Sequence, residues 1–232
     1  MPAQKRVKDR RVPGQTVGVI ATAAEFRLAV RMARPPDLFE LRLDCLFPAP
    51  DLETQIDRLP APVIATARHP AEGGEQSLPL QARRDLVLRF LPGARFIDIE
   101  LRSARAFREL LDRARRRQVG TIISFHQFDS TPTLGSLRAM ASRAKALGAA
   151  VFKVATRTDT TTQLGRLLEF ITENDSGLPV SAMGMGRLGA ASRLLLAQNG
   201  SALIYTALRK RRIEGQLSLD EFRRAVSESG PS

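Results

Sequence analysis

Two short runs, GTIISFHQFD at residues 120–129 and AAVFKVAT at residues 149–156, decide the predicted fold. Each run is rich in Val, Ile, Phe and Ala and is bounded by Gly and polar residues, which is typical of a buried strand in a parallel sheet. Each run nevertheless carries one ionisable side chain in or next to its apolar part, His126 in the first and Lys153 in the second. Because a charged amine is costly to bury, Lys153 is either an edge residue whose amine reaches water or an amine nucleophile.

The period of a strand decides where these two side chains point. Successive side chains alternate between the two faces of a strand. His126 therefore shares a face with Ser124, and Lys153 shares a face with Val151 and Ala155. Because one helix-sized segment separates the two runs, we expect His126 and Lys153 to face one shared interior.

Outward from these runs, strand-like and helix-like stretches alternate along the chain. We predict strands at residues 17–22, 38–44, 63–68, 96–101, 121–126, 151–156, 180–185 and 202–208. We predict helices at residues 23–33, 52–59, 79–91, 104–118, 134–147, 160–174, 189–199 and 219–227, with Thr133, Asp159 and Ser218 as N-caps. Strands that are each followed by a helix in this way predict an α/β protein, a single (β/α)8 TIM barrel. The structural alternative is an open doubly wound sheet, but the chain has no GxGxxG or P-loop motif.

Length and composition fit a single α/β domain. The chain has 232 residues, of which 43% are hydrophobic and 26% are charged. Residues 1–15 (MPAQKRVKDRRVPGQ) are polar and basic, so we expect them to form a flexible tail and residues 16–232 to form the barrel. Two histidines and one cysteine leave too few ligands for a His- or Cys-rich metal site, so we predict no metal site of these kinds. No apolar run is long enough for a spanning helix, which predicts a cytoplasmic location.

The chain is strongly basic, with a formal net charge of +12 and a pI near 11.2. Such a charge is typical of proteins that bind nucleic acid or another polyanion. The arginines are scattered through the predicted helices, however, and no nucleic-acid-binding motif is present. We therefore predict no specific nucleic-acid partner and no membrane partner. An anionic small molecule is compatible with the same charge.

The alternation rule gives several predicted strands one apolar and one polar face. The polar faces carry Glu40, Arg42, Arg68, Asp98, Glu100, His126 and Lys153. Because the apolar faces must pack against the helices, the polar faces point into the barrel. A structural barrel interior is filled by branched apolar side chains, and unpaired buried charges are costly. The polar faces therefore predict a ligand site, which opens at the C-terminal ends of the strands.

Three loops add polar groups at this end of the predicted barrel. RHPAEGG at residues 68–74 follows the third strand and allows Glu72 to reach over the mouth. MGMG at residues 183–186 leads into a helix that carries Arg193 near its start, an arrangement that favours a carboxylate or phosphate. Glu214-Gly-Gln216 follows the last strand and is suited to closing as a lid.

The order and spacing of these motifs resemble the type I 3-dehydroquinate dehydratase (3-dehydroquinase) family of the shikimate pathway, from about residue 17 to residue 222. The matching pieces are ELRLD at 40–44, TAR at 66–68, EGG at 72–74, DIEL at 98–101, ISFHQF at 123–128, TP at 131–132, FKVA at 152–155, MG at 183–184, SR at 192–193 and GQ at 215–216. The resemblance implies a TIM barrel and a lyase that dehydrates 3-dehydroquinate to 3-dehydroshikimate through a Schiff base. It further implies a homodimer and no metal or redox cofactor.

The resemblance also implies roles for nine residues. Lys153 forms the imine with the ring ketone, His126 is the general base and then the acid, and Glu72 orients His126. Arg193 binds the substrate carboxylate and Met183 packs against the ring. The ring hydroxyls are held, and the site is closed, by Glu40, Arg42, Arg68 and Gln216.

The chain departs from the family pattern in two places. The closing loop, commonly a Ser-Ala-Pro-Gly-Gln-like run, is RIEGQ at residues 212–216. Arg212 thus replaces a serine and Glu214 replaces a proline, while Gln127 replaces the usual acid after His126. Arg212 either adds a contact to an anionic ligand or changes which ligand the lid accepts.

Two other functions fit parts of the pattern. A class I aldolase-like barrel also uses a strand lysine to form a Schiff base, but it would be expected to show a phosphate-binding loop after the seventh and eighth strands. A non-catalytic ligand-binding homologue with an altered lid would keep the pocket. Such a protein has no need of an imine-forming Lys153 beside Glu72 and His126.

Overall fold

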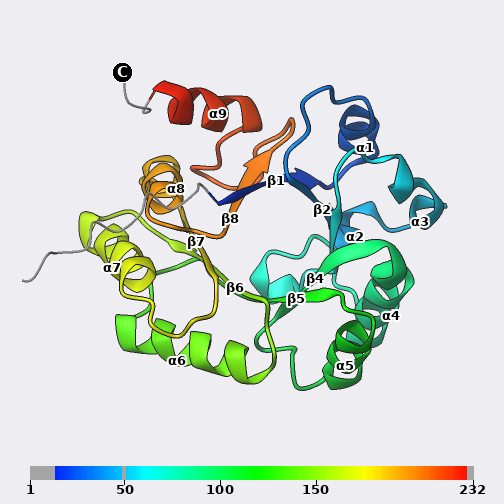
Figure 1. Cartoon of the computed structure of the whole chain (residues 1–232), viewed down its shortest axis with the longest axis horizontal. Helices are drawn as coiled ribbons and strands as arrows, with labels where there is room; N and C mark the ends of the chain where they lie inside the picture. The colour runs from blue at the N-terminus through cyan, green and yellow to red at the C-terminus, as the bar shows by residue number, and fades with distance from the viewer. Residues whose placement is uncertain (1–13, 49–50, 229–232) are drawn as a thin grey trace, which may run out of the picture.

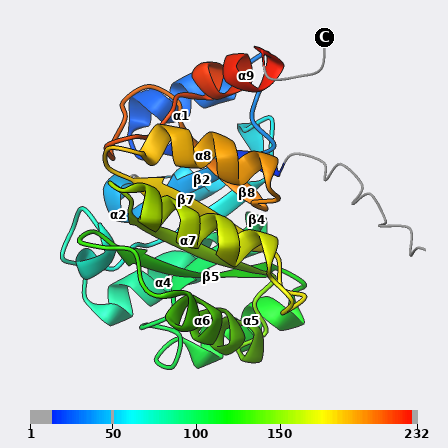
Figure 2. The same cartoon turned by 90° about the vertical axis from the view of Figure 1, so that its left-hand side faces the viewer.

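The computed structural model describes residues 14–48 and 51–228. All but the end of the predicted basic tail therefore lies outside the described residues. The strands run parallel in the order β7-β6-β5-β4-β3-β2-β1-β8, and the helices form a ring around them (Figure 1). Figure 2 shows α8, α7 and α6 stacked along one side of this barrel. The predicted (β/α)8 TIM barrel is confirmed.

The elements lie close to their predicted positions. The strands are β1 Gln15–Ile20, β2 Leu38–Arg42, β3 Val63–Thr66, β4 Ala94–Glu100, β5 Gly120–Gln127, β6 Val151–Arg157, β7 Val180–Met185 and β8 Leu203–Ala207. The helices are α1 Ala23–Val30, α2 Leu43–Leu46, α3 Leu52–Gln55, α4 Leu80–Phe90, α5 Arg108–Arg116, α6 Leu134–Ala146, α7 Thr161–Thr172, α8 Gly189–Gln198 and α9 Leu219–Glu228. Short 3-10 turns occupy Ile56–Arg58, Pro70–Glu72 and Leu91–Gly93.

The largest difference from the predicted elements lies after β2. The strand was predicted to continue to residue 44, but it ends at Arg42 and the short helix α2 follows. The carboxylate of Asp44 explains the turn, since it pairs with Arg42 and accepts the backbone N–H groups of Arg68 and Glu75 at 3.2 and 3.0 Å. The chain therefore curls at the barrel mouth. β1 also begins earlier than predicted, at Gln15, the last residue assigned to the tail.

Two of the three predicted N-caps are confirmed. The hydroxyl of Thr133 accepts the N–H of Ser136 at the start of α6, and the hydroxyl of Ser218 accepts the N–H of Glu221 at the start of α9. The prediction that Asp159 caps α7 was wrong. Thr160 caps this helix in a capping box with Gln163.

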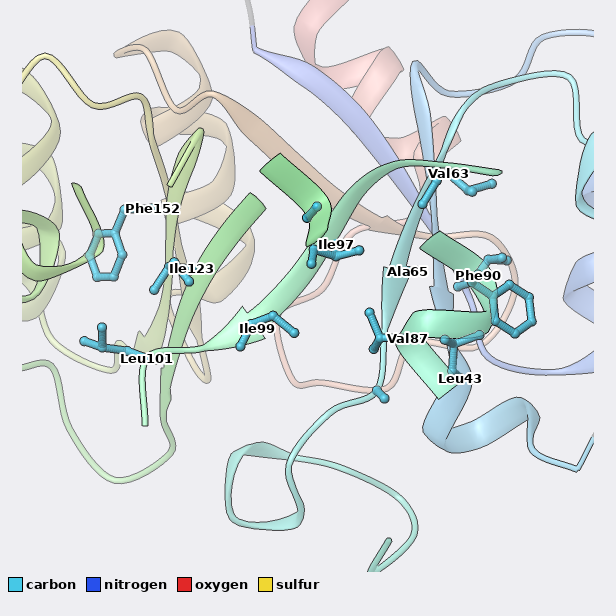
Figure 3. Close-up of a cluster of buried hydrophobic side chains, with 14 of the residues drawn as sticks. Leu43, Val63, Ala65, Val87, Phe90, Ile97, Ile99, Leu101, Ile123 and Phe152 are labelled. Atoms are coloured by element: carbon cyan, nitrogen blue, oxygen red, sulfur yellow. The ribbon is translucent and has the colours of Figure 1, made fainter. Parts of the chain in front are cut away.

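The apolar faces of the strands pack against the helices. Figure 3 shows Ile97, Ile99 and Ile123 turned toward this layer, with Val87 and Phe90 of α4 packed over β3 and β4. A second cluster fills the start of the barrel interior with residues from the first half of six strands, Val17, Leu38, Ile64, Ile122, Val151 and Leu203. The interior is therefore apolar at the N-terminal ends of the strands, which leaves the C-terminal ends for a site.

Serine hydroxyls help to close the barrel between β7 and β8. Ala202 donates its N–H to the carbonyl of Val180 at 2.8 Å, and the hydroxyl of Ser181 donates to the carbonyl of Leu203 at 2.7 Å. The hydroxyl of Ser201 accepts the N–H of Ala182 at 3.1 Å. Within the described residues, this junction has no register of paired backbone groups like those of the other neighbouring strands.

Within the same residues, no helix is both long and apolar enough to cross a membrane.

Candidate active site

A pocket of about 330 Å³ lies at the C-terminal ends of the strands. All nine predicted site residues line it: Glu40, Arg42, Arg68, Glu72, His126, Lys153, Met183, Arg193 and Gln216. A larger depression of about 820 Å³ lies beside α1, α2 and α3 and holds none of them. The structure thus brings the predicted set together, although seven different elements or loops supply it.

Lys153 lies in the middle of β6, and its side chain points into the barrel. The residue is 3% exposed. Its Nζ lies 3.0 Å from Oδ2 of Asp98 and 3.3 Å from Oε1 of Glu40. Burial would raise the pKa of Asp98, but the positive charges of Arg68 and Lys153 outweigh it and lower this pKa. The amine is therefore held between two carboxylates in a site that excludes water.

Arg68 ties the polar floor of the pocket together. The strand that precedes it ends at Thr66, earlier than predicted, yet the Arg68 side chain still turns inward and is 3% exposed. It donates to Asp98 at 2.7 Å and to the hydroxyl of Ser124 at 2.6 Å. These partners satisfy a buried guanidinium, so the polar interior is a paired network rather than a set of isolated charges.

Glu100 was predicted to belong to this interior, and it does join the buried network, with its Oε1 3.4 Å from Nη1 of Arg68. It lines no part of the pocket. Its carboxylate pairs with Arg83 of α4, a helix outside the barrel, and accepts the backbone N–H of His69 at 2.8 Å. Alternation alone could not show this, because Glu100 is the last residue of β4, where the chain leaves the sheet.

Glu72 and His126 form a dyad at the pocket wall. Oε2 of Glu72 lies 3.0 Å from Nδ1 of His126 and also accepts the His126 backbone N–H at 3.0 Å. Burial lowers the pKa of His126 well below its ordinary value, and the charges of Arg68 and Lys153 lower it further. The ring is therefore neutral at neutral pH. Since Nδ1 faces a carboxylate, the proton belongs on Nδ1 and the lone pair on Nε2.

The pKa of Glu72 is raised to about 7, chiefly by burial, and the charge of Arg68 opposes this shift. The ordinary value is 4.5, so the folded protein binds this proton more tightly than the unfolded chain does. The resulting stabilisation is complete below the ordinary value and is lost as the pH rises through about 7. Ionised Glu72 is thus a cost to stability above neutral pH.

We predict that Glu72→Gln will raise the melting temperature at pH 8 and leave it nearly unchanged at pH 5, because Gln resembles the protonated carboxyl group. Thermal melts at the two pH values measure this. Glu75→Gln is the control, since the Glu75 side chain is 64% exposed, and it should shift both melts by a similar small amount. A lower melting temperature for Glu72→Gln at pH 8 would contradict the cost assigned to the ionised group.

Arg193 is a buried cation without a carboxylate partner among the described residues. It lies in α8 and is 3% exposed. Its Nη1 donates to the backbone carbonyl of Tyr205 at 3.0 Å, while its Nε has no hydrogen-bond partner within the described part of the chain. Burial lowers its pKa to about 10. A guanidinium left in this way at a pocket wall is suited to an anionic ligand.

Residues of the predicted lid after β8 line the pocket, among them Arg212, Ile213 and Gln216. The side chain of Gln216 accepts the backbone N–H of Arg212 at 3.0 Å. Gly215 packs against Gly189 with φ +78, so closely that an added Cβ would lie 2.5 Å from the Gly189 Cα. Glu214, which replaces the family's proline, pairs with Arg157 at 3.1 Å. The lid is thus braced by close backbone packing and by an ion pair.

Arg212 lies between two acidic side chains, one from α1 and one from the loop after β3. Its Nη2 is 3.6 Å from Glu25 after β1, and its Nη1 is 3.6 Å from Glu75 after β3. The guanidinium also lines the pocket. Of the alternatives predicted for this residue, the contacts favour an effect on the lid, since both ends of the guanidinium face protein carboxylates.

Sequence reasoning missed Tyr205 as a pocket residue. It lies in β8, where alternation puts it on the same face as Leu203 and Ala207. A lone tyrosine in an apolar strand is the signal that indicates it. Phe128, which is 42% exposed, also lines the pocket. It comes from the loop after β5, where no periodicity applies.

The chain is similar to known proteins over nearly its whole length. The family model described as "Type I 3-dehydroquinase" matches residues 19–231. The 3-dehydroquinate dehydratase of Methanothermobacter thermautotrophicus is 32% identical, over 84% of this chain and 86% of the relative. The enzyme of the same name from Thermococcus gammatolerans is 31% identical, over 89% of this chain and 95% of the relative.

Solved structures resemble the chain in fold. The crystal structure of 3-dehydroquinate dehydratase from Geobacillus kaustophilus superposes with a TM-score of 0.82 at 26% identity, covering 93% of this chain and 90% of that one. The enzyme from Enterococcus faecalis gives a TM-score of 0.82 at 23% identity, covering 97% and 98% of the two chains.

Proposed function

The chain belongs to the type I 3-dehydroquinase family, and from this premise we propose how its own residues dehydrate 3-dehydroquinate to 3-dehydroshikimate. Family membership makes the protein a carbon–oxygen lyase of the shikimate pathway that works through a Schiff base. We propose the substrate, the residues that contact it and the role of each of these residues. Its main support is one observation, the buried amine of Lys153 in the same pocket as a neutral His126.

Lys153 is the nucleophile in this proposal. Its ammonium group first gives one proton to the neighbouring carboxylate of Glu40, and the amine adds to the carbon of the ring ketone. The ketone oxygen then leaves as water with that proton and a second proton from the nitrogen, which gives a positively charged iminium group. The neighbouring carboxylates of Asp98 and Glu40 accept the protons of the free ammonium group at 3.0 and 3.3 Å. They also favour the positive charge of the iminium group.

His126 moves the protons. Its Nε2 takes the proton from the carbon next to the iminium group, and the electron pair of that C–H bond moves toward the nitrogen to give an enamine. The pair then returns and expels the hydroxyl group one carbon further on, which leaves as water with the proton from His126. Glu72 keeps Nδ1 protonated and stabilises the imidazolium form between these steps. Hydrolysis of the product imine regenerates the Lys153 amine.

The remaining pocket residues hold the substrate. Arg193 binds the carboxylate, because its buried charge has no carboxylate partner within the described chain. Met183 packs against the ring. Ring hydroxyls are held by polar groups that line the pocket, and the lid closes over them: Glu40, Arg42, Arg68 and Gln216.

Borohydride reduction tests the proposal directly. With 3-dehydroquinate present, reduction should trap a stable adduct whose mass equals the imine plus two hydrogens, located on the Lys153 peptide. The same protein should produce the absorbance of the enone product when it is mixed with 3-dehydroquinate. Enone formation without any adduct would exclude the imine route. If neither the adduct nor the enone is formed, the dehydratase assignment for this chain is excluded.

Arg193→Met carries a separate prediction. We expect KM to rise roughly 10- to 100-fold, because a hydrogen-bonded charge pair with the substrate is lost, while kcat changes much less. The melting temperature should stay the same or rise, since a buried charge without a counter-ion is removed. Steady-state kinetics and thermal melts measure both quantities. Arg187→Met is the control, since Arg187 is exposed and lines no part of the pocket. An unchanged KM for Arg193→Met would place the substrate carboxylate elsewhere.

The class I aldolase alternative loses support in the pocket itself. A phosphosugar substrate would call for a phosphate site after β7 and β8. Two arginines of the pocket wall there are engaged with the protein instead, since Arg193 donates to the backbone carbonyl of Tyr205 and Arg212 faces Glu25 and Glu75. The homodimer, the cytoplasmic location and the flexible tail stay predictions from the sequence.

A further inference from the structure

Tyr205, the one tyrosine of the chain, lies against the amine of Lys153. It belongs to β8 and is 4% exposed. The centroid of its ring is 3.8 Å from Lys153 Nζ. A cation within about 6 Å of a ring centroid is attracted by the negative face of the ring, and the attraction grows when water is excluded. The ring therefore shares the surroundings of the amine with Asp98 and Glu40.

Two further properties of Tyr205 bear on the site. Its backbone carbonyl accepts the hydrogen bond from Arg193, at 3.0 Å. Burial raises the pKa of its phenol well above the ordinary value, and the negative charges of Glu40 and Asp98 raise it further. The side chain thus stays neutral over the working pH range. Tyr205 therefore contacts both Lys153, proposed to bind the ketone of the substrate, and Arg193, proposed to bind its carboxylate.

We propose that Tyr205 is a positioning residue for the imine chemistry: its ring face holds the Lys153 nitrogen toward the ketone and stabilises the positive charge of the iminium group. The inference rests on the proposed function, because it assumes that Lys153 forms the imine. The ring is then a second source of stabilisation for the iminium charge, beside the carboxylates of Asp98 and Glu40.

The change in hydrogen bonding during the reaction explains why the ring is needed. The free ammonium group has three N–H donors, and two of them are directed to Asp98 and Glu40. The protonated imine has one N–H, so at most one of these direct hydrogen bonds persists. Attraction to the ring face depends on the charge and not on the number of N–H groups. Its share of the stabilisation therefore grows when the imine forms.

The hydroxyl group of Tyr205 has no part in this role. Its oxygen is buried and has no hydrogen-bond partner among the described residues. A buried donor without a partner destabilises the fold. Tyr205→Phe, which keeps the ring and removes the hydroxyl, should therefore raise the melting temperature and leave the chemistry intact.

Comparison of Tyr205→Phe with Tyr205→Leu is the central test. For the Leu variant we expect kcat and the rate of borohydride trapping with 3-dehydroquinate to fall at least about 10-fold, while KM changes less than about 3-fold. The Phe variant should stay within about 3-fold of the parent in all three quantities. The inference is overturned if the Leu variant matches the parent, or if the Phe variant is as impaired as the Leu variant.

Fluorination provides a second test that keeps the fold and the ring size. Because the chain has a single tyrosine, growth with 3-fluorotyrosine labels position 205 alone. Fluorine withdraws electron density from the ring face, so the trapping rate should fall modestly, in the direction of the Leu variant. The single ¹⁹F resonance should also shift when the reduced adduct forms. An unchanged rate together with an unchanged resonance would overturn the inference even if the Leu variant does not fold.

These experiments distinguish a failure of the proposed function from a failure of the role of Tyr205. If the parent protein gives neither enone nor adduct, the proposed function is wrong. If the parent gives both and the Leu variant gives both at the parent's rate, only the role of Tyr205 is wrong.

Discussion

Lys153→Met is expected to abolish the borohydride adduct and to lower kcat by at least about 10⁴-fold, because the reaction loses its nucleophile. Methionine keeps the length of the side chain without the amine. Mass spectrometry after reduction and the absorbance of the enone product measure the two effects. This is the largest effect that we expect from any single substitution.

Stability must be followed in the same variant. Removing the amine takes one counter-charge from Asp98 and Glu40, but Arg68 remains 2.7 Å from Asp98. We therefore expect a lower melting temperature and a protein that still folds. Lys145→Met is a matched control, since Lys145 is exposed on α6 and away from the pocket. An adduct that persists in Lys153→Met would move the nucleophile to Lys210, the other lysine that lines the pocket.

His126→Ala is expected to separate imine formation from dehydration. The adduct should still form, because Lys153 and its carboxylate partners are untouched. The rate of enone formation should fall about 10²- to 10⁴-fold, the usual contribution of a positioned general base and acid. Trapping and turnover are measured on the same sample, so a loss of substrate binding would be seen as a loss of both.

The other histidine of the chain supplies the control. His69 is only half-buried, and its ring accepts the neighbouring N–H of Ala71 at 3.0 Å. It lines no part of the pocket. His69→Ala should therefore stay close to the parent in both measurements. Full turnover in His126→Ala would assign the proton transfers to another group.

The sequence was sufficient to predict the structure wherever a short-range rule applies. Alternation along β5 and β6 placed His126 and Lys153 on one interior, because a buried strand admits only two side-chain directions. The strand and helix pattern predicted the barrel for a similar reason, since parallel strands need crossover helices. The residues of the predicted pocket followed from these two facts and from the family resemblance.

Contacts between distant elements were beyond such rules. Nothing in the sequence indicates that Glu100 pairs with Arg83 of α4, or that Arg212 lies between Glu25 and Glu75. These pairs depend on how loops and helices pack around the barrel, which has no fixed period along the chain. The contact of Tyr205 with Lys153 is of the same kind.

The junction of β7 and β8 has a consequence for motion. The other neighbouring strands are joined by registers of paired backbone groups, whereas serine hydroxyls supply part of the bonding here. Elements with fewer backbone pairs open first in local unfolding. Lys153 and His126 lie on β6 and β5, which are fully paired, while Arg193 and the lid lie beside the junction. We therefore expect the wall that carries Lys153 and His126 to be the stiffer one, and the product to depart past the junction of β7 and β8.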